Sequence, residues 1–164
     1  MLIAEPPRTP YDLHFSVLGI PVRVHPLFWL SAVLLGMNGS KGEPILVALW
    51  VLAVFLSVLV HELGHALAAR AHGWEPWITL QTFGGLASYR PTYRSPRAVL
   101  IITLAGPFAG FLFASLIVVS VRLLGFPVMF QLGGPAGLSL FAGPLANLNT
   151  TLLVTGWFHT VGAV

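Results

Sequence analysis

Apolar residues fill most of this chain, and they run in long segments instead of alternating with polar ones. An α-helix needs about 20 residues of this kind to cross a lipid bilayer. Four helical spans are predicted, at about 24–38, 45–72, 98–121 and 138–161. The first is long enough only if residues ahead of Pro26 belong to it. The pattern therefore predicts an all-α integral membrane protein with a single domain over residues 1–164.

The connection at about 74–92 has a different pattern. Its first half is rich in residues that favour strands, Gly84 and Gly85 interrupt it, and Leu86 begins a second short run. Two short runs around a glycine turn are typical of a β-hairpin. Such backbone is tolerated at membrane depth only where protein or water covers it. We therefore expect a short membrane-associated hairpin between the second and third helices.

Composition excludes an ordinary soluble domain. Hydrophobic residues make up 56% of the chain and charged residues 8%, against about 25% charged residues in soluble domains. The isoelectric point is near 10.0, but the eight Lys and Arg residues are scattered. They are interpreted as topology signals and not as a nucleic-acid patch. Cysteine is absent, so disulfides and thiolate metal ligands are excluded.

The basic residues also predict an orientation. With four crossings, the N-terminus and the 73–97 connection share one side of the membrane, and that side carries six of the eight Lys and Arg residues: Arg8, Arg23, Arg70, Arg90, Arg94 and Arg97. Cytoplasmic loops carry an excess of such residues. The N-terminus is therefore expected in the cytoplasm.

Candidate chemistry lies in the second predicted helix. His61 and His65 are four residues apart, so they share one face of a helix, and Glu62 lies beside them. Two imidazoles so placed can hold one Zn²⁺, and a neighbouring glutamate can act as general base toward water. The alternative is a chance pattern in which Glu62 pairs within a helix bundle. Carboxylates are costly in lipid and usually functional, which favours a metal site.

Four motifs follow one another along the chain: Gly19–Pro26, His61–Ala66, Phe83–Gly85 and Leu104–Pro107. In this order they resemble the entry to the first helix, the HExxH motif, the hairpin turn and the AGP start of the third helix in the site-2 protease family. That family consists of intramembrane zinc metalloproteases. The resemblance covers almost the whole chain.

The resemblance implies a zinc endopeptidase that cleaves transmembrane segments of membrane-bound substrate proteins. It implies Zn²⁺ as cofactor, His61 and His65 as metal ligands and Glu62 as the catalytic base. Phe83, Gly84, Gly85 and Leu86 are implied to contact substrate. The expected partners are a transmembrane protein substrate and the lipid bilayer, without nucleic acid. The expected location is the cytoplasmic membrane of a bacterium or archaeon.

The family's third zinc ligand is an aspartate on a later helix, and this chain has no acidic residue after Glu75. The chain is therefore interpreted as a core that is incomplete at its C-terminus, or as a natural short form. His159 or Asn147 could substitute for the aspartate. Two other functions stay open: a non-catalytic or truncated adaptor that binds membrane helices, and a metal-handling membrane transporter.

Overall fold

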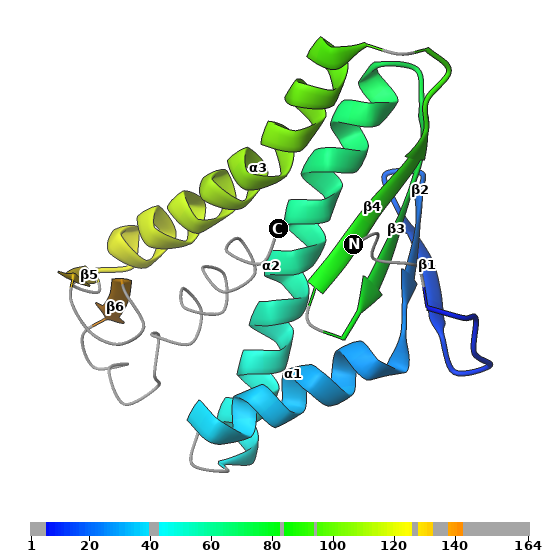
Figure 1. Cartoon of the computed structure of the whole chain (residues 1–164). Helices are drawn as coiled ribbons and strands as arrows, with labels where there is room; N and C mark the ends of the chain where they lie inside the picture. Colours follow the sequence, from blue (N-terminus) through cyan, green and yellow to red (C-terminus); the bar gives the residue numbers. More distant parts are fainter. Residues whose placement is uncertain are drawn as a thin grey trace.

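The computed structural model of the chain describes residues 6–39, 43–82, 84–93, 95–125, 128–132 and 138–142, the last two ranges by their backbone. Three helices and six strands lie in these ranges (Figure 1). The helices are α1 (Pro26–Gly39), α2 (Pro44–Ala71) and α3 (Pro96–Leu123). The strands are β1 (Leu13–Val17), β2 (Ile20–Val24), β3 (Glu75–Gln81), β4 (Gly84–Arg90), β5 (Val128–Leu132) and β6 (Leu138–Ala142).

Helix α2 is the centre of the fold, and its ends follow from local sequence. It begins with Pro44. Proline suits the first turn because the N–H that it lacks would have no acceptor within the helix there. At the other end Gly73 adopts φ +77°, and its N–H donates to the Arg70 carbonyl at 2.9 Å. Trp74 N–H donates to the Ala69 carbonyl at 3.1 Å. This glycine-dependent cap reverses the chain, so that β3 runs back along α2.

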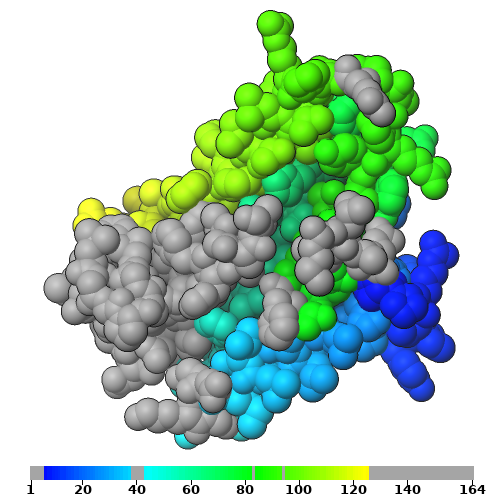
Figure 2. Space-filling model, viewed as in Figure 1, coloured from blue at the N-terminus to red at the C-terminus, as the bar shows by residue number. Residues whose placement is uncertain are grey.

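Helix α3 packs along the other side of α2 (Figure 1). The Ser95 hydroxyl accepts a hydrogen bond from Ala98 N–H at 3.3 Å, and Pro96 starts the helix. Serine is favoured just before the first turn because its oxygen accepts a hydrogen bond from a helical N–H. Proline is favoured in the first turn because the N–H that it lacks would have no acceptor within the helix. In the space-filling view, α3 and the amino-terminal strands lie on opposite sides of the molecule (Figure 2).

A four-stranded mixed sheet covers the side of α2 opposite α3 (Figure 1). The strand order is β1-β2-β3-β4, with β2 and β3 parallel and the two outer pairs antiparallel. The strand side chains that face α2 are apolar and join one buried cluster with the helix, made of Ile20, Val22, Val24, Phe28, Val58, Leu59, Ala66, Ile78 and Leu80. This core holds the sheet against the C-terminal half of α2.

The segment before β1 is tied to the sheet through Asp12. Its carboxylate accepts hydrogen bonds from the N–H of Thr9 at 3.2 Å and from the guanidinium of Arg23 at 3.2 Å. Arg23 also donates to the Pro6 carbonyl at 3.1 Å. The hydrogen bonds from Thr9 and the nearby Arg23 charge lower the pKa of Asp12. The chain from Pro6 onward therefore crosses the outer face of the sheet in a defined path.

The structure corrects the all-α prediction, because a four-stranded sheet accompanies the helices. The hairpin at about 74–92 is present as the β3–β4 pair, but sequence analysis missed β1 and β2. Residues 22–24, which were needed to lengthen the first span, lie in β2 instead. Burial alternates along β2, as in a strand with one face on the core: Ile20, Val22 and Val24 are buried, whereas Pro21 and Arg23 are not.

Two of the predicted spans correspond to long helices. Within the described residues, α2 and α3 are long and apolar enough to cross a membrane, whereas α1 has 14 residues. Exposed apolar side chains line much of α3, among them Leu104, Phe108 and Leu112. Of the predicted span at 138–161, only 138–142 are described, and they form strand β6. Residues 143–161 lie outside the described residues.

The Asp12 tether is expected to depend on pH. A carboxylate whose pKa is lowered by folding stabilises the folded state above its unfolded pKa, and this contribution disappears as the pH falls through the lowered value. Amide hydrogen exchange at Thr9, corrected for the intrinsic exchange rate, should therefore be slow near neutral pH and faster in strong acid. Asp12→Asn should exchange fast throughout.

Glu75→Gln is the matched control because it removes an exposed carboxylate from the start of β3. It should leave the exchange profile of Thr9 unchanged. Equal exchange in the native chain and in Asp12→Asn would contradict the tether.

Candidate metal and catalytic site

The two histidines of the HExxH motif meet on the side of α2 that faces α3. The Nε2 atoms of His61 and His65 lie 3.1 Å apart, and the ring centroids are 4.8 Å apart. Nitrogen ligands of a tetrahedral zinc, each 2.0–2.1 Å from the metal, are separated by about 3.3 Å. The two nitrogens therefore converge at nearly the spacing that one metal ion requires.

Hydrogen bonding selects which nitrogen of His65 stays available. Its Nδ1 lies 2.7 Å from the carbonyl oxygen of Ile102 on α3. A carbonyl only accepts, so Nδ1 carries the proton and Nε2 presents its lone pair. A backbone carbonyl on the far ring nitrogen is a common way to orient a metal-binding histidine. Helix α3 thus prepares His65 as a ligand.

His61 is less fully satisfied by protein groups. It is buried, and its Nδ1 has no hydrogen-bond partner among the described residues. Buried polar atoms are usually paired, so an orphaned nitrogen in this place is a sign of a functional site. Its other ring nitrogen is the Nε2 that meets His65. The donor set on α2 fits a metal ion through two imidazole nitrogens.

Glu62 lies on the face of α2 that contacts the sheet. Its side chain is 7% exposed, and the carboxylate accepts a hydrogen bond from the backbone N–H of Ala87 in β4. A Cβ atom added to Gly85 would come within 3.0 Å of three side-chain atoms of Glu62. Glycine at this position therefore lets the strand reach the carboxylate.

A second glycine does the same for His65. A Cβ atom at Gly106 in α3 would collide with the imidazole ring. On the other helix, a Cβ atom at Gly64 would collide with the Ala105 carbonyl and with Ala109. Small residues at such positions allow two helices to approach closely. The close contact of α2 and α3 is thus a condition for the Ile102–His65 hydrogen bond.

The structure brings together His61, Glu62, His65 and Gly85 from the predicted site. Gly84 and Leu86 lie in β4 opposite Gln81 and Thr79, respectively. Phe83 falls outside the described residues. So do His159 and Asn147, the two suggested substitutes for the third ligand. Within the described part of the chain, no third His, Asp or Glu joins the two histidines as a metal cluster.

Three contributors to the site were missed by sequence analysis: the Ile102 carbonyl, the Ala87 N–H and Gly106. The first two are backbone groups and leave no signal in side-chain chemistry. Gly106 did leave one, because it belongs to the AGP motif at 105–107. That motif was expected at the start of the third helix, but α3 begins at Pro96 and the motif lies inside it. Its function here is to make room for His65.

Comparison with known proteins agrees with this geometry. Residues 49–162, more than half of the chain, match Peptidase family M50. The chain belongs to peptidase family M50, the site-2 protease family. It is 36% identical over 121 residues to a protein from Synechocystis assigned as a zinc metalloprotease, covering 66% of this chain. It is 27% identical over 124 residues to a zinc metalloprotease of Methanocaldococcus jannaschii, covering 72% of this chain.

The fold also agrees. The site-2 protease from Methanocaldococcus jannaschii superposes with a TM-score of 0.57 at 26% identity, over 90% of this chain and 63% of that one. The chain spans about a third of the length of the curated relatives it matches, 32% and 36%. The family is zinc-dependent and cleaves membrane proteins. Membership of this family, together with the two long apolar helices α2 and α3, indicates an integral membrane protein.

Adjacent glycines in β4 provide a test of the site's tight packing. Gly85→Ala should push its new methyl group into Glu62 and destabilise the fold by about 1–3 kcal/mol, the usual cost of overpacking. Gly84→Ala is the matched control because a Cβ atom there would meet nothing within 4 Å. Thermal or denaturant unfolding in detergent should separate the two variants. Equal unfolding midpoints would contradict the described contact.

Proposed function

We propose that this chain forms the catalytic core of an intramembrane zinc endopeptidase that cleaves transmembrane segments of membrane-bound substrate proteins, as in regulated intramembrane proteolysis. The observation that carries the proposal is the convergence of two imidazole nitrogens, 3.1 Å apart, beside a buried glutamate. All three side chains belong to a helix long and apolar enough to cross a membrane. Polar groups in such a place are expensive and are usually functional.

His61 and His65 would hold the zinc through Nε2. When bound, zinc supplies a Lewis acid for a peptide carbonyl and lowers the pKa of bound water to about 7. His65 keeps its orientation through Nδ1–H and the Ile102 carbonyl. A catalytic zinc usually has three protein ligands. The described residues supply two of them.

Glu62 is the proposed general base. Its carboxylate would take a proton from water as the water oxygen forms a bond to the scissile carbonyl carbon. It would then deliver that proton to the amide nitrogen as the carbon–nitrogen bond breaks, so that an acid and an amine leave. The hydrogen bond from Ala87 N–H holds the carboxylate on the sheet side of α2. Glu62 thus faces the space where an extended peptide could lie.

The edge of β4 is the proposed substrate-binding element. Among the described strands, β4 pairs only with β3. A strand N–H that does not bond to the neighbouring strand points to the opposite edge, and the N–H of Ala87 bonds to Glu62. The general base therefore lies at the open edge of β4. An unwound substrate segment that adds there as a strand would pass directly by the catalytic carboxylate.

Orientation completes the proposal. The N-terminal segment and the connection from α2 to α3 carry most of the basic residues, so the proposed side for both is the cytoplasm. The site then lies toward the cytoplasmic end of α2. The proposed location is the cytoplasmic membrane of a bacterium or archaeon.

A second candidate function is supported by the ligand count. Two imidazoles without a third protein ligand bind zinc less firmly, and a helix-binding adaptor needs no metal. The described residues supply only those two nitrogen ligands. An adaptor would bind the same substrate helices at the β4 edge without cutting them. A metal-handling transporter has no comparable observation in its favour.

Substitution of Glu62 distinguishes the two functions. The chain is reconstituted in lipid nanodiscs, its zinc content is measured per chain, and cleavage of a fluorescently labelled transmembrane peptide is followed. Glu62→Gln keeps the size of the side chain and removes its basic oxygen, so cleavage should fall at least about 100-fold while zinc content is retained. His61→Ala should lower both.

Glu75→Gln is the control because it makes the same substitution at an exposed position, and it should keep both zinc content and cleavage. Cleavage that survives in Glu62→Gln would rule out Glu62 as the base. Peptide binding without any cleavage by the native, zinc-loaded chain would favour the adaptor.

A further inference from the structure

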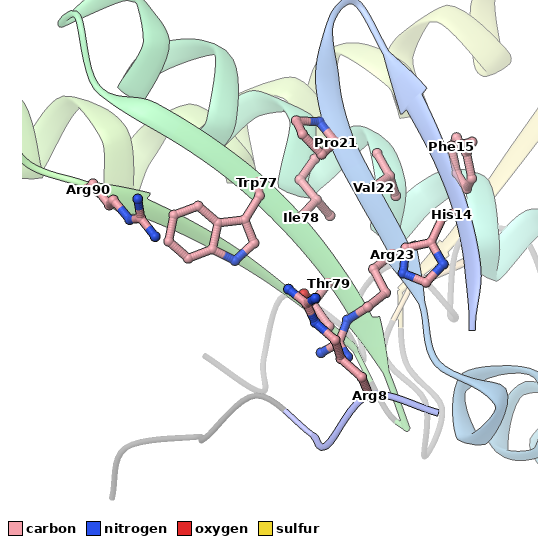
Figure 3. A pocket seen from close by; sticks show the side chains of 10 residues that line it. All are labelled: Arg8, His14, Phe15, Pro21, Val22, Arg23, Trp77, Ile78, Thr79 and Arg90. Atoms are coloured by element: carbon pink, nitrogen blue, oxygen red, sulfur yellow. The ribbon is translucent and has the colours of Figure 1, made fainter. Parts of the chain in front are cut away.

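The outer face of the sheet, away from α2 and the zinc site, contains a cleft of about 500 Å³ (Figure 3). Its polar lining comes from Arg8, His14, Arg23, Trp77, Thr79 and Arg90. We propose that this cleft binds the phosphate of an anionic phospholipid headgroup. The inference rests on the proposed membrane setting of α2, but it does not depend on metal binding or on proteolysis.

Positive charge is the first reason. Three guanidinium groups line the cleft, from the amino-terminal segment, from β2 and from β4 (Figure 3). The structure pairs one of them, Arg23, with the carboxylate of Asp12 at 3.2 Å. Arg8 and Arg90 are exposed, and no ion pair joins either to an acidic side chain in the described part of the chain. Guanidinium groups bind phosphate through paired hydrogen bonds.

The arginines are positioned by neighbouring groups. Arg90 lies over the ring of Trp77, with its Cζ atom 5.7 Å from the ring centroid, and an aromatic face stabilises a cation at this distance. The hydrogen bond from Arg23 to the Pro6 carbonyl fixes the segment that carries Arg8. The cleft is therefore built from three separate pieces of chain that tertiary contacts hold together.

Depth in the membrane is the second reason, and it selects a lipid as the occupant. The 28 residues of α2 make about 42 Å of helix, whereas the hydrocarbon core of a bilayer is about 30 Å thick. A helix of this length tilts within the core or reaches beyond it. Its C-terminal end carries the exposed cation Arg70 in the last turn, so this end reaches the headgroups at the lowest cost.

The sheet packs against the C-terminal half of α2, through Val58, Leu59 and Ala66. Glu75, the first residue of β3, lies just after the end of the helix, and Arg90 lies opposite it in the backbone register of β3 and β4. The end of the cleft that carries Arg90 is thus level with the headgroups. Tryptophan is enriched at this level of a membrane, which agrees with Trp77 in the lining.

Native mass spectrometry of the whole chain in detergent would test the proposal. The probes are phosphatidylglycerol and phosphatidylcholine of equal chain length, and the readout is the fraction of chains that retain lipid. We expect at least about fivefold greater retention of phosphatidylglycerol. Arg8→Gln combined with Arg90→Gln should remove this preference. Arg23 is left unchanged because it supports the fold.

The matched control is Arg97→Gln combined with Arg122→Gln, which removes the same charge from two exposed positions on α3 outside the cleft. It should keep the preference for phosphatidylglycerol. Circular dichroism of both double variants verifies that they fold. Equal loss in the two variants, or no preference in the native chain, would overturn the proposal.

Competition separates the possible sources of phosphate. Inorganic phosphate should displace phosphatidylglycerol only at far higher concentration, because it lacks the acyl chains that keep the lipid in the detergent micelle around the protein. Displacement by equal concentrations of inorganic phosphate or of a glutamate-rich peptide would show that the lipid is not the preferred occupant. Zinc content is measured on the same samples. Zinc loss with lipid preference intact would count against the protease proposal alone.

Discussion

The site depends on close approach of backbone to polar side chains that lie on an apolar helix. Helix α2 carries His61, Glu62 and His65 in a setting where unpaired polar groups are costly. The two elements that pack on α2 at the site each supply one backbone group that forms a hydrogen bond with a polar side chain. These groups are the Ile102 carbonyl from α3 and the Ala87 N–H from β4. Neither group could reach its partner if side chains held α3 and β4 away from α2.

Glycine is what permits this approach. A Cβ atom at Gly85 would collide with Glu62, and one at Gly106 would collide with His65. The two glycines come from different elements on opposite sides of α2, yet they serve the same physical purpose. They let a strand and a helix pack closely on the side chains of the candidate site, so the sheet is as much a part of that site as the helix that carries the motif.

The sheet has two faces with separate chemistry. Its inner face is apolar and joins the buried cluster with α2, which places the edge of β4 beside Glu62. Its outer face carries the arginine-lined cleft. Alternation of side chains along β2 assigns Val22 to the first face and Arg23 to the second. The proposed lipid binding would hold the proposed substrate-binding edge of β4 at a constant depth relative to the site.

The sequence alone determined the membrane character, the two long helices and the grouping of His61, Glu62 and His65 on α2. Each of these depends on residues that are close together in the chain. Apolar length and four-residue spacing on a helix are local properties. The β3–β4 hairpin was also predictable, since a glycine turn joins its strands. In contrast, β1 and β2 were missed. Each has only five residues, and the end of β2 adjoins an apolar helix, so residues 22–24 were assigned to the predicted first span.

Only the tertiary structure decided which backbone groups complete the site and where the arginines gather. Ile102 is 37 residues from His65 along the chain, and Arg8 is far in sequence from Arg90. No local pattern records such pairs, because their meeting depends on how α2, α3 and the sheet pack together. The basic residues were interpreted from the sequence as topology signals. Three of them, Arg8, Arg23 and Arg90, line one cleft in the folded chain. Side-chain chemistry can be read along a chain, whereas distances between remote groups arise only when the chain has folded.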